Sequence, residues 1–163
     1  DLSAQFHAAD EQHVALLHPY DVDLVVLAGY MRRIGPGVLA AFPLRVMNIH
    51  PALLPSFPGA HGQRDAVNKG VKISGCTVHF ADEEFDRGPI IIQAAVPVLP
   101  SDDEAALAAR ILRQEHKIYP QAIQWFAQGR LLVEGNRVRV DPPAPAYTQD
   151  DGFIISPGLE IFR

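Results

Sequence analysis

The sequence has 163 residues, of which 48% are hydrophobic and 20% charged, so it suits one globular domain with a buried core. The formal net charge of −5 argues against a protein that binds nucleic acid through a basic face. Because no run of about 18 apolar residues occurs, we expect no membrane partner and a cytoplasmic protein.

The first half of the chain predicts alternating helices and strands. Apolar residues recur at helical spacing over residues 3–17, and a short apolar strand follows over residues 23–28. A helix is predicted over residues 36–42, opened by a proline, and the next strand over residues 46–50. This order predicts a doubly wound, Rossmann-like α/β domain with a mostly parallel sheet.

The second half continues with the same kinds of element. The predicted elements are a helix over residues 64–69, strands over 72–80 and 89–98, a helix with its N-cap in 101–104, and a hairpin of strands 131–134 and 137–140. Pro120 lies inside the long helical segment and is expected to kink or divide it. Residues 1–140 are expected to form the domain, and the proline-rich residues 141–163 an extended tail.

Two polar side chains stand at the end of the second predicted strand. Asn48 and His50 are two residues apart, so on a strand they point to the same face. Open α/β sheets bind ligands at the carboxyl ends of their strands. Asp86 lies in an acidic loop, from which it would orient or charge the imidazole. Taken alone, His50 suits a hydrogen-bonded core histidine, Asn48 a cap and Asp86 a turn residue. The rigid proline- and glycine-rich segment 48–61 around the first two favours a catalytic site.

Neither a metal site nor a disulfide is predicted. The single cysteine, Cys76, lies in a predicted strand, where a buried inert thiol is expected. The seven histidines are scattered, and no HExxH or CxxC pattern occurs. A glycine-rich phosphate loop near the start is also missing, which predicts an N-terminally truncated domain without its first strand–loop–helix unit.

Four sequence blocks resemble the formyltransferases that use 10-formyltetrahydrofolate. The blocks, in that family's order and spacing, are VVLAGYMRRIGP, NIHPALLPSFPGAHG, TVHFADEEFDRGPII and RQEHKIYPQAIQWFAQGRL. EHKIYP favours the branch that formylates glycinamide ribonucleotide in purine biosynthesis. The chain has no room for the tRNA-binding domain of methionyl-tRNA formyltransferases. A formyltetrahydrofolate deformylase, another folate-dependent formyltransferase, or an inactive folate-binding fragment remain alternatives.

The resemblance implies the roles of the catalytic residues. Asn48 would donate a hydrogen bond to the formyl oxygen as the carbon becomes tetrahedral. His50 would stabilise the same intermediate and give a proton to the departing folate nitrogen. Asp86 would hold His50 and favour its protonated form. The amine of glycinamide ribonucleotide would attack directly, so no covalent enzyme intermediate is expected.

The resemblance also implies binding residues for the two small-molecule substrates. For 10-formyltetrahydrofolate they are Met31, Arg32, Arg33, Ile34, Asn48, Ala81, Asp82, Glu83 and Asp86, with Arg32 or Arg33 as an alternative partner of the anionic glutamate tail. Glu115 would bind the ribose hydroxyls of glycinamide ribonucleotide, with His61 in support. His79 is left open between a structural and a supporting role. A monomer and a homodimer are both compatible with the sequence.

Overall fold

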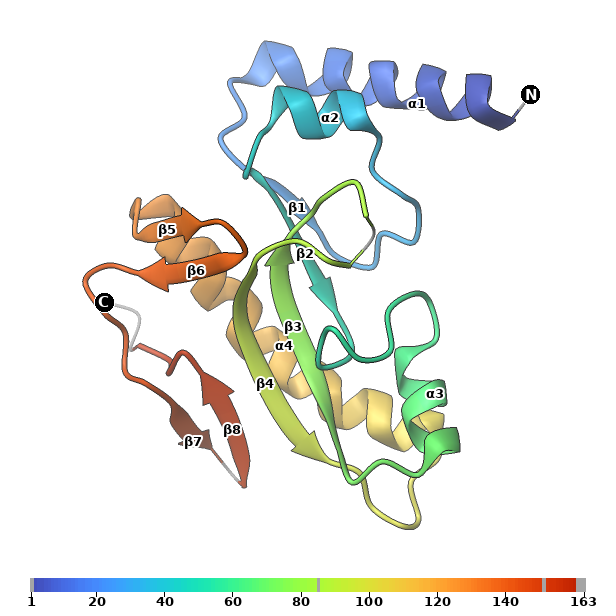
Figure 1. Ribbon diagram of the computed structural model, residues 1–163, viewed down its shortest axis with the longest axis vertical. Coiled ribbons are helices and arrows are strands. Elements are labelled where there is room, and N and C mark those ends of the chain that lie inside the picture. The colour runs from blue at the N-terminus through green and yellow to red at the C-terminus, as the bar shows by residue number, and fades with distance from the viewer. Residues whose placement is uncertain (1, 85, 151, 161–163) are drawn as a thin grey trace.

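The part of the chain that the computed structural model describes, residues 2–84, 86–150 and 152–160, forms an eight-stranded sheet with helices packed around it (Figure 1). The strands are β1 (Val25–Leu27), β2 (Val46–His50), β3 (Ile73–Phe80), β4 (Ile90–Pro97), β5 (Leu131–Glu134), β6 (Arg137–Val140), β7 (Thr148–Asp150) and β8 (Phe153–Ser156). The helices are α1 (Leu2–Leu17), α2 (Pro36–Ala41), α3 (Gly62–Lys69) and α4 (Glu104–Ala127), with a 3-10 turn at His18–Tyr20. The predicted α/β class is confirmed.

The sheet is mixed, with strand order β1-β2-β3-β4-β6-β5 and β8 attached to β4. Pairing is parallel between β1 and β2 and at one β4–β6 bridge, but antiparallel along β2–β3 and β3–β4. The parallel content among the described strands is therefore smaller than the sequence pattern suggested. Residues 81–89 alone connect β3 to β4, and a parallel crossover needs about a dozen residues or more.

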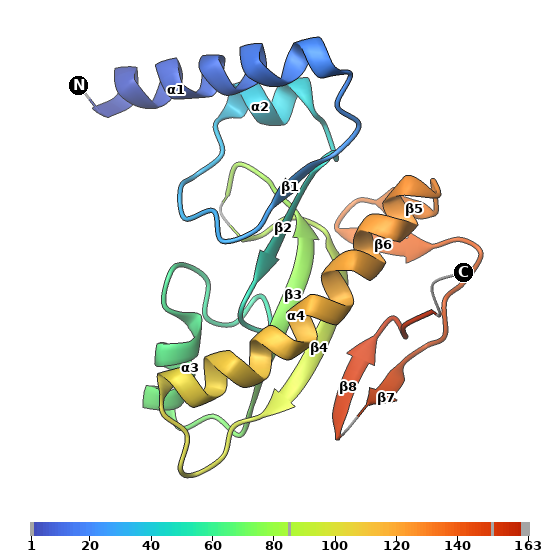
Figure 2. The same cartoon turned by 180° about the vertical axis from the view of Figure 1, so that it is seen from behind.

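Helix α4 covers one face of β3 and β4 and supplies much of the core (Figure 2). Its first amide groups are capped by Asp103, whose carboxylate accepts a 2.8 Å hydrogen bond from the Ala106 amide. The expectation that Pro120 kinks or divides the helix is wrong as to division, because α4 is one continuous helix. Ile111 and Trp125, before and after the proline, are buried in the same core, while Pro120 itself is exposed. Packing of both halves therefore outweighs the hydrogen bond that proline removes.

The C-terminal segment 141–163, expected to be an extended tail, contributes two strands to the sheet. β7 and β8 form an antiparallel hairpin, and β8 pairs with β4 through Ala94↔Ile155. The Ile155 side chain is fully buried, and Phe153 and Leu159 also pack against the core, so apolar residues dock the segment. Glu160 then forms an ion pair with Arg130, its Oε2 lying 2.6 Å from Nη1. The high proline content led to the prediction of an extended tail. Proline is nevertheless tolerated beside edge strands, so it did not prevent this docking.

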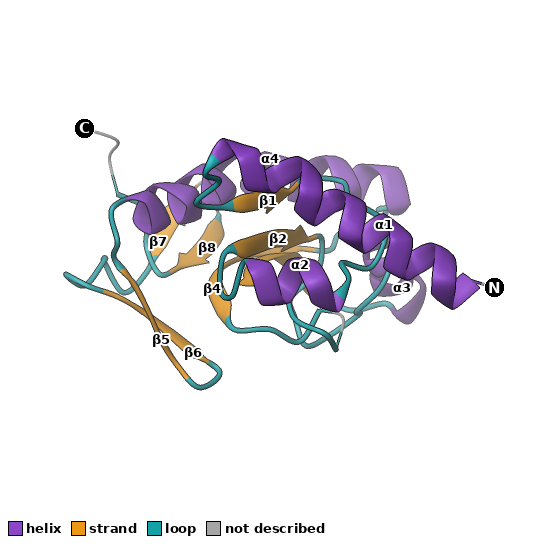
Figure 3. Ribbon diagram, turned by 90° about the horizontal axis from the view of Figure 1, so that it is seen from above, coloured by secondary structure: helices purple, strands orange, loops and turns teal. Residues whose placement is uncertain are grey.

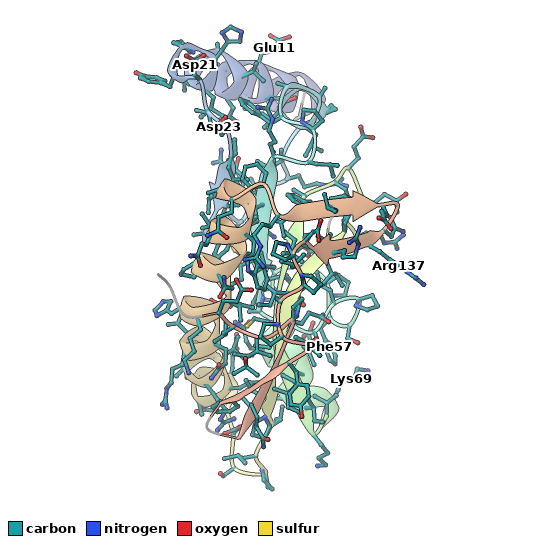
Figure 4. All side chains as sticks on the ribbon, turned by 90° about the vertical axis from the view of Figure 1, so that its left-hand side faces the viewer. Glu11, Asp21, Asp23, Phe57, Lys69 and Arg137 are labelled. Carbon is teal, nitrogen blue, oxygen red and sulfur yellow. The ribbon has the colours of Figure 1, made fainter. Side chains whose placement is uncertain are left out.

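The N-terminal helices α1 and α2 pack against each other (Figure 3) and lie beyond the ends of β1 and β2 (Figure 1). The Asp10 carboxylate on α1 accepts hydrogen bonds from the amides of Gly37 (2.6 Å) and Val38 (3.1 Å) and thus caps α2. Charged side chains such as Lys69 and Arg137 project outward from the folded chain (Figure 4). Of the described helices, none is long and apolar enough to cross a membrane.

Candidate active site

Strands β2 and β3 bring four polar side chains onto one face of the sheet. Asn48 lies opposite His79 and His50 lies opposite Thr77 in the antiparallel ladder. Directly opposed residues share a face, as do residues two apart on one strand. The prediction that Asn48 and His50 point the same way is therefore confirmed, and His79 joins them across the ladder.

His50 faces the Asp86 carboxylate inside the protein. Its Nδ1 lies 3.5 Å from Asp86 Oδ2, and both side chains are almost fully buried. Its Nε2 lies 2.8 Å from the Phe57 carbonyl oxygen, to which an Nε2–H donates. The imidazole is thus fixed from two sides, by a carboxylate at one nitrogen and a backbone carbonyl at the other.

Asp86 holds two loops together and has a backbone conformation that few residues other than glycine adopt. Its Oδ2 accepts a 2.9 Å hydrogen bond from the Gly59 amide, which joins the acidic loop to the proline-rich loop. Its φ is +60°, a left-handed conformation that costs a residue other than glycine about 1–3 kcal/mol. Such strain persists only where the surrounding contacts determine it, as they do here through Gly59 and the two histidines.

His79 fixes the orientation of the Asn48 amide. Its Nδ1 lies 2.9 Å from the Phe80 carbonyl oxygen and its Nε2 lies 3.2 Å from Asn48 Nδ2. Burial lowers the pKa of His79, although Asp86, 3.7 Å from Nε2, acts in the opposite direction. A neutral ring that donates from Nδ1 to the carbonyl leaves Nε2 as an acceptor. Asn48 therefore donates one N–H to His79, and its second N–H has no acceptor among the described residues.

These residues form one wall of a cavity of about 280 Å³ at the ends of the first strands. Asn48, His50 and Asp86 all line it. The residues expected at a folate site that also line it are Met31, Arg32, Ile34, Ala81 and Asp82. Glu115 reaches the same cavity from α4, and burial raises the pKa of its carboxyl. Amide donor, imidazole, carboxylate and apolar surface thus meet in one concave site.

Three predicted binding residues do not line the cavity as the described residues form it. Arg33 and Glu83 contact each other instead: Arg33 Nη2 donates to the Glu83 carbonyl oxygen at 3.1 Å and so bridges the loops on two sides of the cavity. His61 is exposed at the N-cap of α3 and makes no side-chain capping bond. The family resemblance assigned all three to binding because its sequence blocks include them beside residues that do line the cavity.

Sequence reasoning missed several lining residues, of which Tyr30 and Gln63 have polar side chains. Tyr30 directly precedes Met31 in the loop after β1. Gln63 lies in the first turn of α3, from which a helical side chain leans back toward the preceding loop. That helix direction was the available signal for Gln63. Among the described residues, no group of three or more His, Cys, Asp or Glu side chains is arranged to hold a metal ion.

The fold and the site together define an α/β enzyme whose amide–imidazole–carboxylate cluster faces a small-molecule cavity. The chain belongs to the formyl transferase family, whose model, described as "Formyl transferase", matches residues 2–123.

The similar proteins carry closely related descriptions. The chain is 40% identical over 156 residues to phosphoribosylglycinamide formyltransferase of Escherichia coli (strain K12), covering 92% of this chain and 74% of that protein. It is 56% identical to the crystal structure of glycinamide ribonucleotide transformylase 1 from Symbiobacterium toebii, with a TM-score of 0.79, covering 80% of this chain and 62% of that one. The chain is 34% identical to a formyltetrahydrofolate deformylase from Pseudomonas syringae pv. tomato str. DC3000. That crystal structure matches with a TM-score of 0.75, and the match covers 82% of this chain and 45% of that one. The chain thus spans about three quarters of the first relative and less than two thirds of either of these two solved structures.

Proposed function

We propose that this protein transfers the formyl group of 10-formyltetrahydrofolate to the amine of glycinamide ribonucleotide in purine biosynthesis. The observation that carries the proposal is the Asn48 amide, held by His79 with one N–H left for a ligand, beside the His50–Asp86 pair in one cavity. The relatives described as glycinamide ribonucleotide formyltransferases support the choice of substrates.

The proposed chemistry begins with attack of the substrate amine on the formyl carbon. A C–N bond forms, the carbonyl electron pair moves to oxygen, and the free N–H of Asn48 stabilises that oxyanion. When the intermediate collapses, the bond from carbon to the folate nitrogen breaks and that nitrogen takes a proton from His50. The oxyanion re-forms the C=O bond in that collapse, and the product nitrogen gives its extra proton to the now neutral His50, so His50 is protonated again and the charges balance.

His50 is proposed to be cationic when it acts, with the Asp86 carboxylate at 3.5 Å as its counter-ion. For that step the Nε2–H leaves the Phe57 carbonyl, 2.8 Å away, for the substrate. A loop carbonyl is a weaker partner for a cationic donor than a developing oxyanion. The exchange therefore strengthens the hydrogen bond as the transition state forms.

Binding of the two substrates is assigned to different walls of the cavity. Met31, Ile34 and Ala81 offer apolar surface to a flat heterocycle, and the exposed Arg32 offers a cation to the glutamate tail. Glu115, on α4, is proposed to accept hydrogen bonds from the ribose hydroxyls. His61 is not part of this assignment, because it does not line the described cavity. A cytoplasmic location and the choice between monomer and homodimer stay predictions.

A deformylase is the second candidate, favoured by the similar deformylase structure. Here water would replace the amine as the nucleophile at the same cluster. The deciding experiment follows the absorbance change as 10-formyltetrahydrofolate becomes tetrahydrofolate, with and without glycinamide ribonucleotide. Release that requires the ribonucleotide supports the transferase. Release at the same rate without it contradicts the transferase and supports the deformylase, and no release with either contradicts both.

A further inference from the structure

Tyr119 connects helix α4 to the ends of two strands beside the cavity. Its hydroxyl lies 2.7 Å from the Leu27 carbonyl oxygen at the end of β1 and 2.8 Å from the Met47 carbonyl oxygen in β2. The phenol carries one hydrogen, which the two carbonyl oxygens share. Burial raises the pKa of Tyr119, so the hydroxyl stays protonated and acts as a donor. One side chain thus ties three elements together.

Both carbonyl groups belong to the immediate surroundings of Asn48. The Met47 carbonyl is part of the planar peptide unit that leads into Asn48, so fixing its oxygen fixes the plane from which that residue starts. Leu27 is paired with Asn48 in the β1–β2 register and lines the cavity. The described β1–β2 ladder has only three residue pairs, so few other contacts define this strand end.

The same side chain sets the position of α4 relative to the cavity. Glu115 precedes Tyr119 by four residues, one helical turn, so both lie on the same side of α4. Glu115 lines the cavity, whereas Tyr119 lies beneath the strand ends and does not line it in the described residues. If α4 slid along its axis by about 1 Å, less than the 1.5 Å rise of one residue, Glu115 would move by the same amount. A misplacement of about 1 Å is enough to lower the rate of an enzyme substantially.

From this geometry we infer that Tyr119 is a positioning residue: its hydroxyl holds the Met47–Asn48 peptide and the helix that carries Glu115 in a fixed mutual arrangement. The inference rests on the proposed function for its kinetic consequence. It assigns no contact between Tyr119 and the substrate, and its effect passes through Asn48 and Glu115.

Tyr119→Phe in the full chain tests the inference, with Tyr147→Phe as the matched loss of one hydroxyl at an exposed site. We expect kcat to fall by about tenfold to a hundredfold and the KM for glycinamide ribonucleotide to rise, because small misplacements near reacting groups carry such costs. Tyr147→Phe should leave both values unchanged. Ile155→Val, a buried change far along the sheet, controls for loss of stability alone.

A double-mutant cycle separates positioning from a merely structural role. In an Asn48→Ala background, Tyr119→Phe should lower kcat little further, since its effect on kcat passes through the missing amide, whereas the rise in KM, which passes through Glu115, should remain. If the double variant lost kcat by the product of the two single-variant factors, the inference would be overturned. A kcat of Tyr119→Phe within twofold of the native value would overturn it as well. Absence of ribonucleotide-dependent transfer in the native protein contradicts the proposed function instead. In that case NMR still decides: Tyr119→Phe should shift the Asn48 side-chain amide signals, and unchanged signals would refute the positioning role.

Discussion

The Asn48 side-chain nitrogen lies 3.2 Å from Nε2 of His79, across the β2–β3 ladder and 31 residues away in the chain. This contact orients the amide only while His79 is neutral, because a protonated ring has no acceptor nitrogen. The oxyanion donor of the proposed reaction therefore depends on a buried histidine that makes no proton transfer itself. The predictions below begin from this pair.

Replacement of Asn48 by Ala should lower kcat by about 10²–10³, the usual loss when one oxyanion donor is removed. The fold should remain, since the Asn48 side chain is only partly buried and β2 is paired on both sides. Steady-state kinetics and circular dichroism measure the two effects. Asn68→Ala, at an exposed position on α3, is the matched control and should behave as the native protein. A kcat within tenfold of native for Asn48→Ala contradicts the mechanism.

His79→Gln should make stability less dependent on pH below neutrality. Burial lowers the pKa of His79 in the folded state, while in the unfolded chain it titrates near 6.5. As pH falls below about 6.5, the unfolded state therefore binds a proton that the folded state resists, and stability is lost. The stabilising contribution is complete above that pH. The contribution of His79 to the free energy of unfolding changes by less than about 1.4 kcal/mol per pH unit.

Urea unfolding of native protein and His79→Gln between pH 8 and pH 5 measures this difference. The native free energy of unfolding should fall more steeply with acidification than that of the variant. Parallel curves would mean that His79 titrates alike in both states. The remaining histidines are common to both proteins, so they cancel in the comparison.

Asp86→Asn should separate the charge of Asp86 from its role in holding the loops. Asparagine accepts the left-handed conformation and keeps an oxygen for the Gly59 amide, so stability should change little. Loss of the counter-ion of His50 should lower kcat by about tenfold to a hundredfold. Asp86→Ala removes the acceptor as well and should also lower the melting temperature. Equal kcat for native protein and Asp86→Asn would remove the charge from the mechanism.

Arg33→Ala should raise the KM for 10-formyltetrahydrofolate by about two- to tenfold without changing kcat. The guanidinium bridges the two loops beside the cavity through the Glu83 carbonyl, and this exposed hydrogen bond has a modest energy. Initial rates at varied folate concentration give both parameters. Arg64→Ala, a comparably exposed arginine on α3, should leave the KM at its native value. A drop in kcat with an unchanged KM would argue for a different role of Arg33.

Glu160→Gln should weaken the docking of the C-terminal segment. The Glu160 carboxylate accepts hydrogen bonds from Trp125 Nε1 and the Arg130 guanidinium, and Arg130 lowers its pKa. The ion pair stabilises the fold above the unfolded glutamate pKa near 4.5, and its contribution is lost as pH falls through the lower folded value. At pH 7 the variant should lose about 1 kcal/mol in urea unfolding. Limited proteolysis should also cut faster after residue 140, and unchanged cleavage would count against the docking role.

The sequence by itself determined the local features of this protein. Period-2 spacing placed Asn48 and His50 on one face, and the polar cluster 101–104 marked the start of α4, which Asp103 caps. The proline-rich segment identified the site, and the family blocks identified the class. These features depend on the geometry of neighbouring residues, which the order of residue types encodes directly.

Only the tertiary structure decided which distant residues meet. It paired His79 with Asn48, bound the Asp86 carboxylate to Gly59, carried α4 unbroken through Pro120, and added β8 to the edge of β4. It also moved Arg33 from the cavity wall to a bridge between loops. Strand register and helix docking follow from burial summed over the whole core, so no local pattern specifies them.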